Sequence, residues 1–399
     1  MKSRRVLVIG GGIAGPAVGI ALKRAGIDVV IHEASREARD NEGAFLNLAP
    51  NGLSVLRVLG VPHALDEGTG FQNDRLVFHN DGGRVLADVA VGGVTLMRGA
   101  LSRALRQAAG RLGVPFEFGK HVESVHDDGG ELRIRFSDGS ESSGSCVIGA
   151  DGIHSRTRSS VLPDGPRPTY TGIVNLGGVV RTDLPPTGVA MHMIFGRRAF
   201  FGYAVRPSGD TYWFSNYAQK TEPPDGRPLT VSADGIRPQL LDLHRDDPPV
   251  VSRILEAVTD NVGAFPVYDI PSLPTWHRGA VCLIGDAAHA MGPHVGQGTS
   301  LALEDAFVIA KCLRDLSDAP EAFTAFERIR RGRVEPVLVQ SRRTAQQKAP
   351  AGWIARKIRD LVLPVFLRKG AAATAALYRI NLDWDERIAV RHDNEADLS

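Results

Sequence analysis

Apolar residues in the first thirty positions follow two different spacings. Val6–Ile9 and Ile27–Ile31 are short, largely apolar runs, as expected of parallel strands that are buried on both faces. Between them the apolar positions recur at helical spacing, and Gly26 follows as a C-cap. This alternation predicts a strand, a helix and a second strand, which together form one βαβ unit.

The rest of the chain divides into helical stretches and a long strand-rich stretch. Helices are predicted at Pro50–Leu59, Gly99–Leu112 and Thr299–Leu313, where apolar residues recur every three or four positions. Residues 169–217 alternate as strands do and are unusually aromatic, and residues 263–270 predict a further strand. The pattern therefore predicts an α/β chain with a β-rich segment inserted between its α/β parts.

The first predicted strand leads into the pattern Gly10-x-Gly12-x-x-Gly15, with Ile13 and Ala14 where the helix begins. Gly10 permits a tight turn, Gly12 lets the backbone approach a pyrophosphate, and Gly15 allows close helix–strand packing. The unpaired N–H groups of the helix N-terminus attract phosphate. The pattern indicates a dinucleotide but does not separate FAD from NAD, and a glycine-rich turn without a ligand is the alternative.

Two carboxylates follow predicted strands. Glu33 ends the second strand 18 residues after Gly15, where it would accept hydrogen bonds from ribose hydroxyls. Asp286 follows the apolar run Val281–Ile284 and Gly285, where it would bind a ribityl or ribose hydroxyl. The alternative for Asp286 is a residue that caps a turn.

A proline and a second glycine cluster follow Asp286. Pro293 precedes Gly296, Gln297 and Gly298, which open the predicted helix. The backbone N–H groups at this helix terminus attract negative charge, and they would stabilise the negatively charged edge of a reduced flavin.

A middle motif joins Asp151 and Gly152 to Ser155, Arg156 and Arg158. The two arginines would meet phosphate charge. The alternative is a helix capped by Asp or Ser, with both arginines in solvent.

Composition excludes several other classes of protein. The net charge is +2 and no run of Lys or Arg suggests a nucleic-acid surface. No signal-peptide pattern and no membrane-spanning apolar stretch is visible, so we expect a cytoplasmic protein. The three cysteines are scattered without metal-site spacing, and no metal is expected.

The segments VLVIGGGIAG, CVIGADGIHSRTR and VCLIGDAAHAMGPHVGQG resemble the GxGxxG, DG and GD motifs of class A flavoprotein monooxygenases. The resemblance to this p-hydroxybenzoate hydroxylase-like family includes residues 43–60 and the MRGALSRAL segment that holds Arg98. Size and C-terminus are similar to the single-component branch, which includes urate and salicylate hydroxylases, kynurenine 3-monooxygenase and the tetracycline-inactivating monooxygenases.

The resemblance implies FAD as the cofactor and gives several residues a role. Glu33 would bind the adenosine ribose, and Arg98 the FAD phosphate or ribityl region. Asp151 would serve FAD and NAD(P)H docking, and Asp286 would bind the sugar-phosphate portion. The residues that would line the isoalloxazine nearest the chemistry are Pro293, Gly296, Gln297 and Gly298.

The fold implied is a Rossmann-like FAD-binding domain of the GR2 type, with an inserted β-rich substrate domain and a C-terminal helical segment. The FAD-binding domain would comprise residues 1–73, 98–168 and 273–345. The substrate domain would comprise residues 74–97 and 169–272, and the helical segment residues 346–399.

The activity implied is monooxygenation with NADH or NADPH as co-substrate. One oxygen atom of O₂ would pass through a flavin C4a-hydroperoxide into an aromatic or polyketide-like small molecule, in specialised metabolism, catabolism or antibiotic inactivation. Two alternatives stay open: an FAD-dependent reductase or dehydrogenase on the same fold, and a flavin-binding protein without turnover. A monomer or a homodimer is expected.

The substrate side is less defined by the sequence. Phe201, Tyr203 and Trp213 are predicted to face a substrate pocket, with core packing as the alternative for each. No general base is assigned, because His192, His289 and His294 also fit structural roles. Residues 353–369 mix apolar and basic side chains; we expect packing on the cofactor domain rather than membrane contact.

Overall fold

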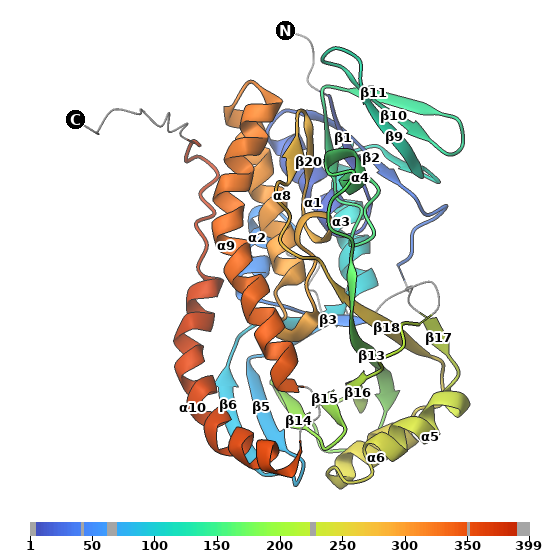
Figure 1. The fold of residues 1–399 in the computed structure, drawn as a ribbon, viewed down its shortest axis with the longest axis vertical. Coiled ribbons are helices and arrows are strands. Elements are labelled where there is room, and N and C mark those ends of the chain that lie inside the picture. Colours follow the sequence, from blue (N-terminus) through green and yellow to red (C-terminus); the bar gives the residue numbers. More distant parts are fainter. Residues whose placement is uncertain (1–4, 41–43, 62–69, 224–228, 349–351, 389–399) are drawn as a thin grey trace, which may run out of the picture.

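The computed structural model describes residues 5–40, 44–61, 70–223, 229–348 and 352–388. The molecule contains two large sheets, one in the upper half and one in the lower half of Figure 1. Helices α9 (Ala319–Lys348) and α10 (Trp353–Tyr378) lie along one side, and α10 packs on the edge strand β6 of the lower sheet. No helix among these residues is long and apolar enough to cross a membrane.

The upper sheet has six strands in the order β19-β20-β12-β1-β2-β8, and all neighbours pair in parallel except β19 and β20. Helix α1 (Ala14–Arg24) packs on it, and α3 (Arg98–Arg111) and α8 (Gly298–Asp315) pack against α1 in the same core. The parallel register brings the carboxyl ends of β1, β12 and β20 to one edge. The strands are β1 Arg5–Ile9, β2 Asp28–Glu33, β8 Phe116–Phe118, β12 Cys146–Gly149, β19 His277–Arg278 and β20 Val281–Leu283.

The lower sheet has eight strands in the order β17-β18-β13-β16-β15-β14-β5-β6. All its neighbours are antiparallel except β14 and β5, which join segments far apart in the chain. Helices α5 (Ala233–Leu243) and α6 (Pro249–Glu256) pack on one face. The strands are β5 Arg75–Asn80, β6 Val85–Ala90, β13 Thr169–Arg181, β14 Ala190–Phe195, β15 Ala199–Val205, β16 Asp210–Ala218, β17 Leu229–Val231 and β18 Val262–Asp269.

Two small sheets and several short elements complete the described fold. One sheet has the order β3-β7-β4 and the other β11-β10-β9. Helix α2 packs against α8. The bounds are β3 Phe45–Leu48, β4 Gly70–Gln72, β7 Val94–Met97, β9 Val122–Asp127, β10 Leu132–Phe136, β11 Glu141–Gly144, α2 Pro50–Val58, α4 Thr157–Val161, α7 Asp286–His289 and the 3₁₀ helix η3 Pro293–Val295.

The elements predicted from periodicity correspond to observed ones. The three predicted helices are α2, α3 and α8, and each observed end lies within two residues of the prediction. The predicted βαβ unit is β1, α1 and β2. The predicted α/β fold with an inserted β-rich part is confirmed; the domain boundaries stay a prediction.

Candidate active site

A cavity of about 810 Å³ joins the two large sheets. The turns that follow β1, β12 and β20 line one part of it, and one face of the eight-stranded sheet lines another. Its volume falls in the upper part of the range of small-molecule sites, ~300–1,000 Å³. The three sequence motifs therefore meet at one site, although they are far apart in the chain.

The glycines of the first motif have different physical roles. Gly10 has φ +106°, and a Cβ there would lie 2.4 Å from the carbonyl oxygen of Ala150. A Cβ on Gly15 would lie 1.9 Å from the carbonyl oxygen of Gly10, so this position requires glycine for packing. A Cβ on Gly12 would meet nothing within 4 Å. Gly10, Gly12, Ile13 and Ala14 line the cavity, whereas Gly15 does not.

The Glu33 carboxylate lies at the cavity in a fixed orientation. Its Oε2 accepts a hydrogen bond from the Gly11 N–H at 2.6 Å, and its Oε1 accepts one from the Ser35 N–H at 2.8 Å. Each carboxylate oxygen can accept a further bond. The arrangement suits a ligand hydroxyl at the end of β2, as the sequence predicted for a ribose.

Asp286 and Arg98 also line the cavity, and both side chains are exposed to it. Within the described part of the chain, neither side chain has a hydrogen-bond or ion-pair partner. Arg98 is the first residue of α3, and Asp286 the first residue of α7. A free guanidinium, a free carboxylate and the open space at Gly12 fit FAD, whose phosphates and ribityl hydroxyls need these partners.

The Asp151 carboxylate is occupied by protein groups, although the residue lines the cavity. It accepts hydrogen bonds from the Ser155 hydroxyl at 2.6 Å, the Thr157 hydroxyl at 3.0 Å, and the N–H groups of Arg156 and Thr157 at 2.9 and 3.0 Å. The capping alternative therefore describes this carboxylate, which holds the start of α4. Its role in docking FAD and NAD(P)H remains a prediction.

The two arginines of the middle motif differ. Arg158 is buried, and it donates to the carbonyl oxygens of Ala287 at 3.1 Å and Ile153 at 2.7 Å. Burial lowers its pKa. Arg158 thus ties the middle motif to the turn after Asp286, and the expectation that it meets phosphate is wrong. Arg156 does line the cavity.

A buried carboxylate outside the three sequence motifs fixes the Asp286 turn. Asp305, on α8, accepts hydrogen bonds from the Gly285 N–H at 2.8 Å, from His289 at 2.6 Å and from Arg330 at 2.6 Å. Burial acts to raise the pKa of Asp305, but His289 and Arg330 outweigh it and hold the pKa below its usual value. His289 is thereby a positioning residue.

Gln297 points away from the cavity. Its side chain is buried, and its Oε1 accepts a hydrogen bond from Asn51 at 3.1 Å. Asn51 also donates to Glu304 at 2.7 Å, and Glu304 is paired with Arg330 at 2.7 Å. The Gln297 side chain therefore holds α2 against α8, and the prediction that residue 297 lines the isoalloxazine concerns its backbone N–H and stays a prediction.

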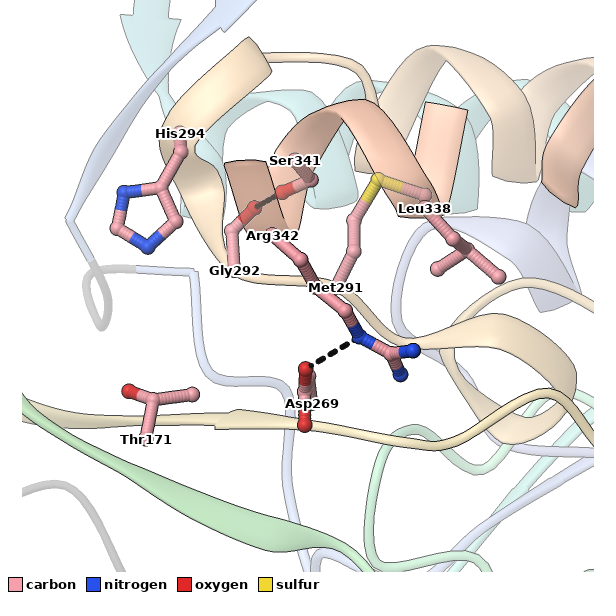
Figure 2. Close-up of a pocket in the computed structure, with 8 residues that line it drawn as sticks. All are labelled: Thr171, Asp269, Met291, Gly292, His294, Leu338, Ser341 and Arg342. Atoms are coloured by element: carbon pink, nitrogen blue, oxygen red, sulfur yellow. Dashed lines mark hydrogen bonds and ion pairs between the residues drawn. The ribbon is translucent and has the colours of Figure 1, made fainter. Parts of the chain in front are cut away.

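The loop between Asp286 and α8 is anchored by the end of α9 (Figure 2). The Ser341 hydroxyl donates to the Gly292 carbonyl oxygen at 2.9 Å, and Arg342 pairs with Asp269 of β18 at 2.9 Å. The small pocket drawn there has a volume of about 30 Å³, enough for about one water molecule. Pro293, Gly296 and Gly298 line the main cavity in front of this anchor.

The three aromatic residues predicted for the substrate pocket do not line the cavity. Phe201 and Trp213 are almost fully buried, stack at 6.0 Å and belong to the core between the sheet and α5 and α6. Tyr203 packs on the same core and stacks on His192 at 5.1 Å. The pocket prediction is therefore wrong for all three, because the strand register points them to the helix-covered face.

The same face holds a buried Ser–His–Asp arrangement. The Ser215 hydroxyl lies 2.8 Å from Nε2 of His244, and Nδ1 of His244 lies 2.6 Å from Asp247. Asp247 also accepts a hydrogen bond from the N–H of Arg197, in the turn between β14 and β15, at 3.2 Å. All three side chains are buried and none lines the cavity, so the arrangement stabilises the sheet instead of forming a nucleophile.

Comparison with known proteins decides the family. The family model described as FAD binding domain matches residues 3–340, which is most of the chain. The chain belongs to this family. FAD as the cofactor, predicted from the motifs and the resemblance, is confirmed with it.

Curated relatives match over most of their length. "Aurachin C monooxygenase/isomerase" of Stigmatella aurantiaca is 31% identical over 88% of this chain and 93% of its own. "FAD-dependent urate hydroxylase" of Klebsiella pneumoniae is 29% identical over 85% of this chain and 89% of its own. The crystal structure of Klebsiella pneumoniae HpxO complexed with FAD and uric acid superposes with a TM-score of 0.81, 26% identity and coverage of 94% and 96%.

These findings confirm the predicted resemblance to class A-like single-component flavoprotein monooxygenases. The protein is an enzyme of the FAD-dependent monooxygenase type. Asp151, Asp286, Arg98 and Glu33 keep their cofactor roles as predictions with the contacts given above.

Proposed function

We propose that this enzyme uses NAD(P)H and O₂ to insert one oxygen atom into an aromatic or polyketide-like small molecule held against the eight-stranded sheet. The observation that carries the proposal is the continuity of the cavity. The same 810 Å³ space is lined by Asp286, Arg98 and Gly12 and by an uncharged wall that includes Met191 and Phe214. A flat apolar ring placed on this wall would share one water-poor space with the cofactor.

FAD, when bound, supplies the redox chemistry, because it accepts hydride from NAD(P)H and then activates O₂. The chain's own residues bind and orient. Arg98 would pair with phosphate, and Glu33 and Asp286 would accept hydrogen bonds from sugar hydroxyls. Gly298 is the first residue of α8 and Gly296 caps the end of η3; both line the cavity, where the N-terminus of α8 attracts negative charge.

Besides binding and orienting the cofactor, the protein must exclude water during oxygen transfer. Met191, Met193, Phe214 and Phe265 supply apolar surface on the sheet side. Tyr378, at the end of α10, lines another part of the cavity, and burial raises the pKa of its phenol. The phenol is therefore neutral at physiological pH and can donate a hydrogen bond.

The relatives support this reaction class without fixing the substrate. Their names record action on urate, on 6-hydroxynicotinate and in aurachin metabolism. The tetracycline destructases share the fold at 20–22% identity, which shows the fold alone. A cytoplasmic location and a monomeric or homodimeric state stay predictions.

The proposal is tested with purified enzyme loaded with FAD, NAD(P)H, ¹⁸O₂ and metabolite extracts from the source organism. A product that carries one ¹⁸O atom, identified by mass spectrometry, supports it and identifies the substrate. Consumption of NAD(P)H coupled to a reduced, unlabelled product would favour the reductase alternative instead.

A further inference from the structure

Two asparagines lie side by side on the sheet wall of the cavity. Asn175 of β13 and Asn216 of β16 are direct partners in the antiparallel register, and both line the cavity. Directly opposed residues in such a pair hold their Cβ atoms ~5 Å apart. Their two carboxamides therefore form one polar patch.

The two carboxamides have no partner among the residues that the structure describes. Within the part of the chain that the structure describes, neither side chain makes a hydrogen bond, and both Oδ1 atoms are buried without a partner. Asn216 is only 9% exposed. Asn73, 1% exposed and also at the cavity, has a third Oδ1 of this kind. Buried polar groups are nearly always hydrogen-bonded, so these oxygens indicate a ligand that supplies the donors.

The surroundings of the pair are uncharged. Strands of the eight-stranded sheet contribute eight residues to the lining of the cavity. All eight are neutral, and they include Met193 and Phe265. Of the arginines and the lysine that line the cavity, Arg98 begins α3 and Arg156 belongs to the middle motif. Lys120 lies next to Glu33, whose carbonyl oxygen accepts the Lys120 N–H at 2.8 Å. An aromatic carboxylate on the sheet wall would thus lack a cation, and its charge would be poorly solvated.

We propose that Asn175 and Asn216 bind the polar edge of a neutral aromatic ring that carries an N–H or O–H donor beside a carbonyl acceptor. A carboxamide presents one acceptor and two donors, so it complements such an edge. Exchange of the oxygen and nitrogen positions in either amide leaves the complementarity unchanged. This proposal rests on the proposed function, which makes the cavity a substrate site. It specifies the class of aromatic substrate that the site would bind.

The test compares three bicyclic compounds of similar size with the FAD-loaded enzyme, and binding is read from the perturbation of the flavin absorption spectrum. They are 2-quinolone, with a ring N–H beside a carbonyl, N-methyl-2-quinolone, which lacks the donor, and 2-naphthoate, which is anionic. We expect 2-quinolone to bind about tenfold more tightly than each of the others, since one hydrogen bond contributes up to about tenfold in Kd. Equal or tighter binding of 2-naphthoate, or no binding of 2-quinolone, overturns the proposal.

The variants Asn175→Leu and Asn216→Leu keep the side-chain size and remove the amide. Each is expected to weaken 2-quinolone binding about tenfold and to leave 2-naphthoate binding unchanged or tighter. Ser215→Ala is the matched control, because Ser215 neighbours Asn216 on the same strand but faces the other side. FAD content and melting temperature establish folding, and Asn→Ser replaces any leucine variant that loses FAD. Leucine or serine variants that retain the 2-quinolone preference overturn the proposal.

A failure of the asparagine assignment and a failure of the proposed monooxygenase reaction would give different results. Asn-dependent binding of 2-quinolone with no ¹⁸O in any product would leave the recognition intact and contradict the monooxygenase reaction. Efficient ¹⁸O insertion into an aromatic acid, undiminished by either leucine variant, would leave the monooxygenase reaction intact and overturn the asparagine assignment.

Discussion

Asp305 and His289 are hydrogen-bonded at 2.6 Å beneath the turn that carries Asp286, and both side chains are at most 2% exposed. The same carboxylate accepts the Gly285 N–H, so α8 fixes the backbone just before Asp286. The position of Asp286 at the cavity therefore depends on a charge that does not itself line the cavity.

Asp305→Asn should weaken both the fold and FAD binding. The variant keeps the shape but removes one of the two buried carboxylates that pair with Arg330, and breaking a buried ion pair costs ~3–5 kcal/mol. We expect this loss in the free energy of unfolding of the apoprotein, measured with urea, and a Kd for FAD at least about tenfold higher. The control is Asp88→Asn, which breaks the more exposed pair with Arg75 and should cost at most ~1 kcal/mol. Equal losses in the two variants would contradict the positioning role.

Asp286→Ala and Asp151→Ala should separate cofactor binding from stability. Asp286 has no partner in the described chain, so its removal should leave the melting temperature of the apoprotein unchanged. Its loss should raise the Kd for FAD, measured by flavin fluorescence quenching, at least about tenfold. Asp151→Ala removes four accepted hydrogen bonds at the start of α4 and should destabilise the apoprotein by about 2 kcal/mol. The reverse pattern would overturn both assignments.

Within the first motif, Gly12→Ala should affect FAD binding, whereas Gly15→Ala should affect stability. A methyl group at Gly12 meets open space, so the unfolding free energy of the apoprotein should change by no more than about 0.5 kcal/mol. The methyl group would occupy the approach of the pyrophosphate, and FAD affinity should fall at least about tenfold. At Gly15 it would collide with the Gly10 carbonyl oxygen, and a loss of at least about 2 kcal/mol is expected. A folded Gly12→Ala enzyme with unchanged FAD affinity would falsify the pyrophosphate placement.

The sequence predicts those parts of the site that local chemistry determines. A strand, a tight turn and a helix place Gly10, Gly12 and Glu33 within one βαβ unit, so their arrangement follows from neighbours in the chain. The parallel register of β1, β12 and β20 then brings Asp286 to the same edge.

The remaining parts depend on long-range pairing that periodicity does not reveal. Phe201 and Asn216 lie in equally strand-like runs, and only the register of β15 and β16 and the position of α5 decide which one faces the cavity. The contact of Asp305 with Arg330, 25 residues away, joins two helices whose packing angle no local pattern gives. The sequence signal for this contact was the pair of charged residues Glu304 and Asp305 inside an apolar helical stretch. Charged side chains are buried almost only when they are paired, so these two predict a buried cationic partner.

Acid should weaken the first motif through His32. Its ring is fully buried at 4.8 Å from Phe136, and its carbonyl oxygen accepts the Gly10 N–H at 2.8 Å. Burial lowers the pKa of His32 from 6.5 to about 4, against the opposing effect of Glu117 at 3.2 Å. The unfolded chain therefore binds a proton below pH 6.5 that the folded chain does not. The stabilisation from the neutral ring is complete above pH 6.5 and is lost as the pH falls towards 4.

One pKa unit corresponds to about 1.4 kcal/mol, so His32 should account for a loss of about 2 kcal/mol between pH 7.5 and pH 5. His32→Leu removes the titrating group and should flatten the pH dependence by that amount in urea unfolding of the apoprotein. His126→Leu serves as the control, because His126 is exposed on β9 and its replacement should leave the slope unchanged. A His32→Leu protein whose unfolding free energy falls with acid as steeply as that of the wild type would show that other groups govern the transition.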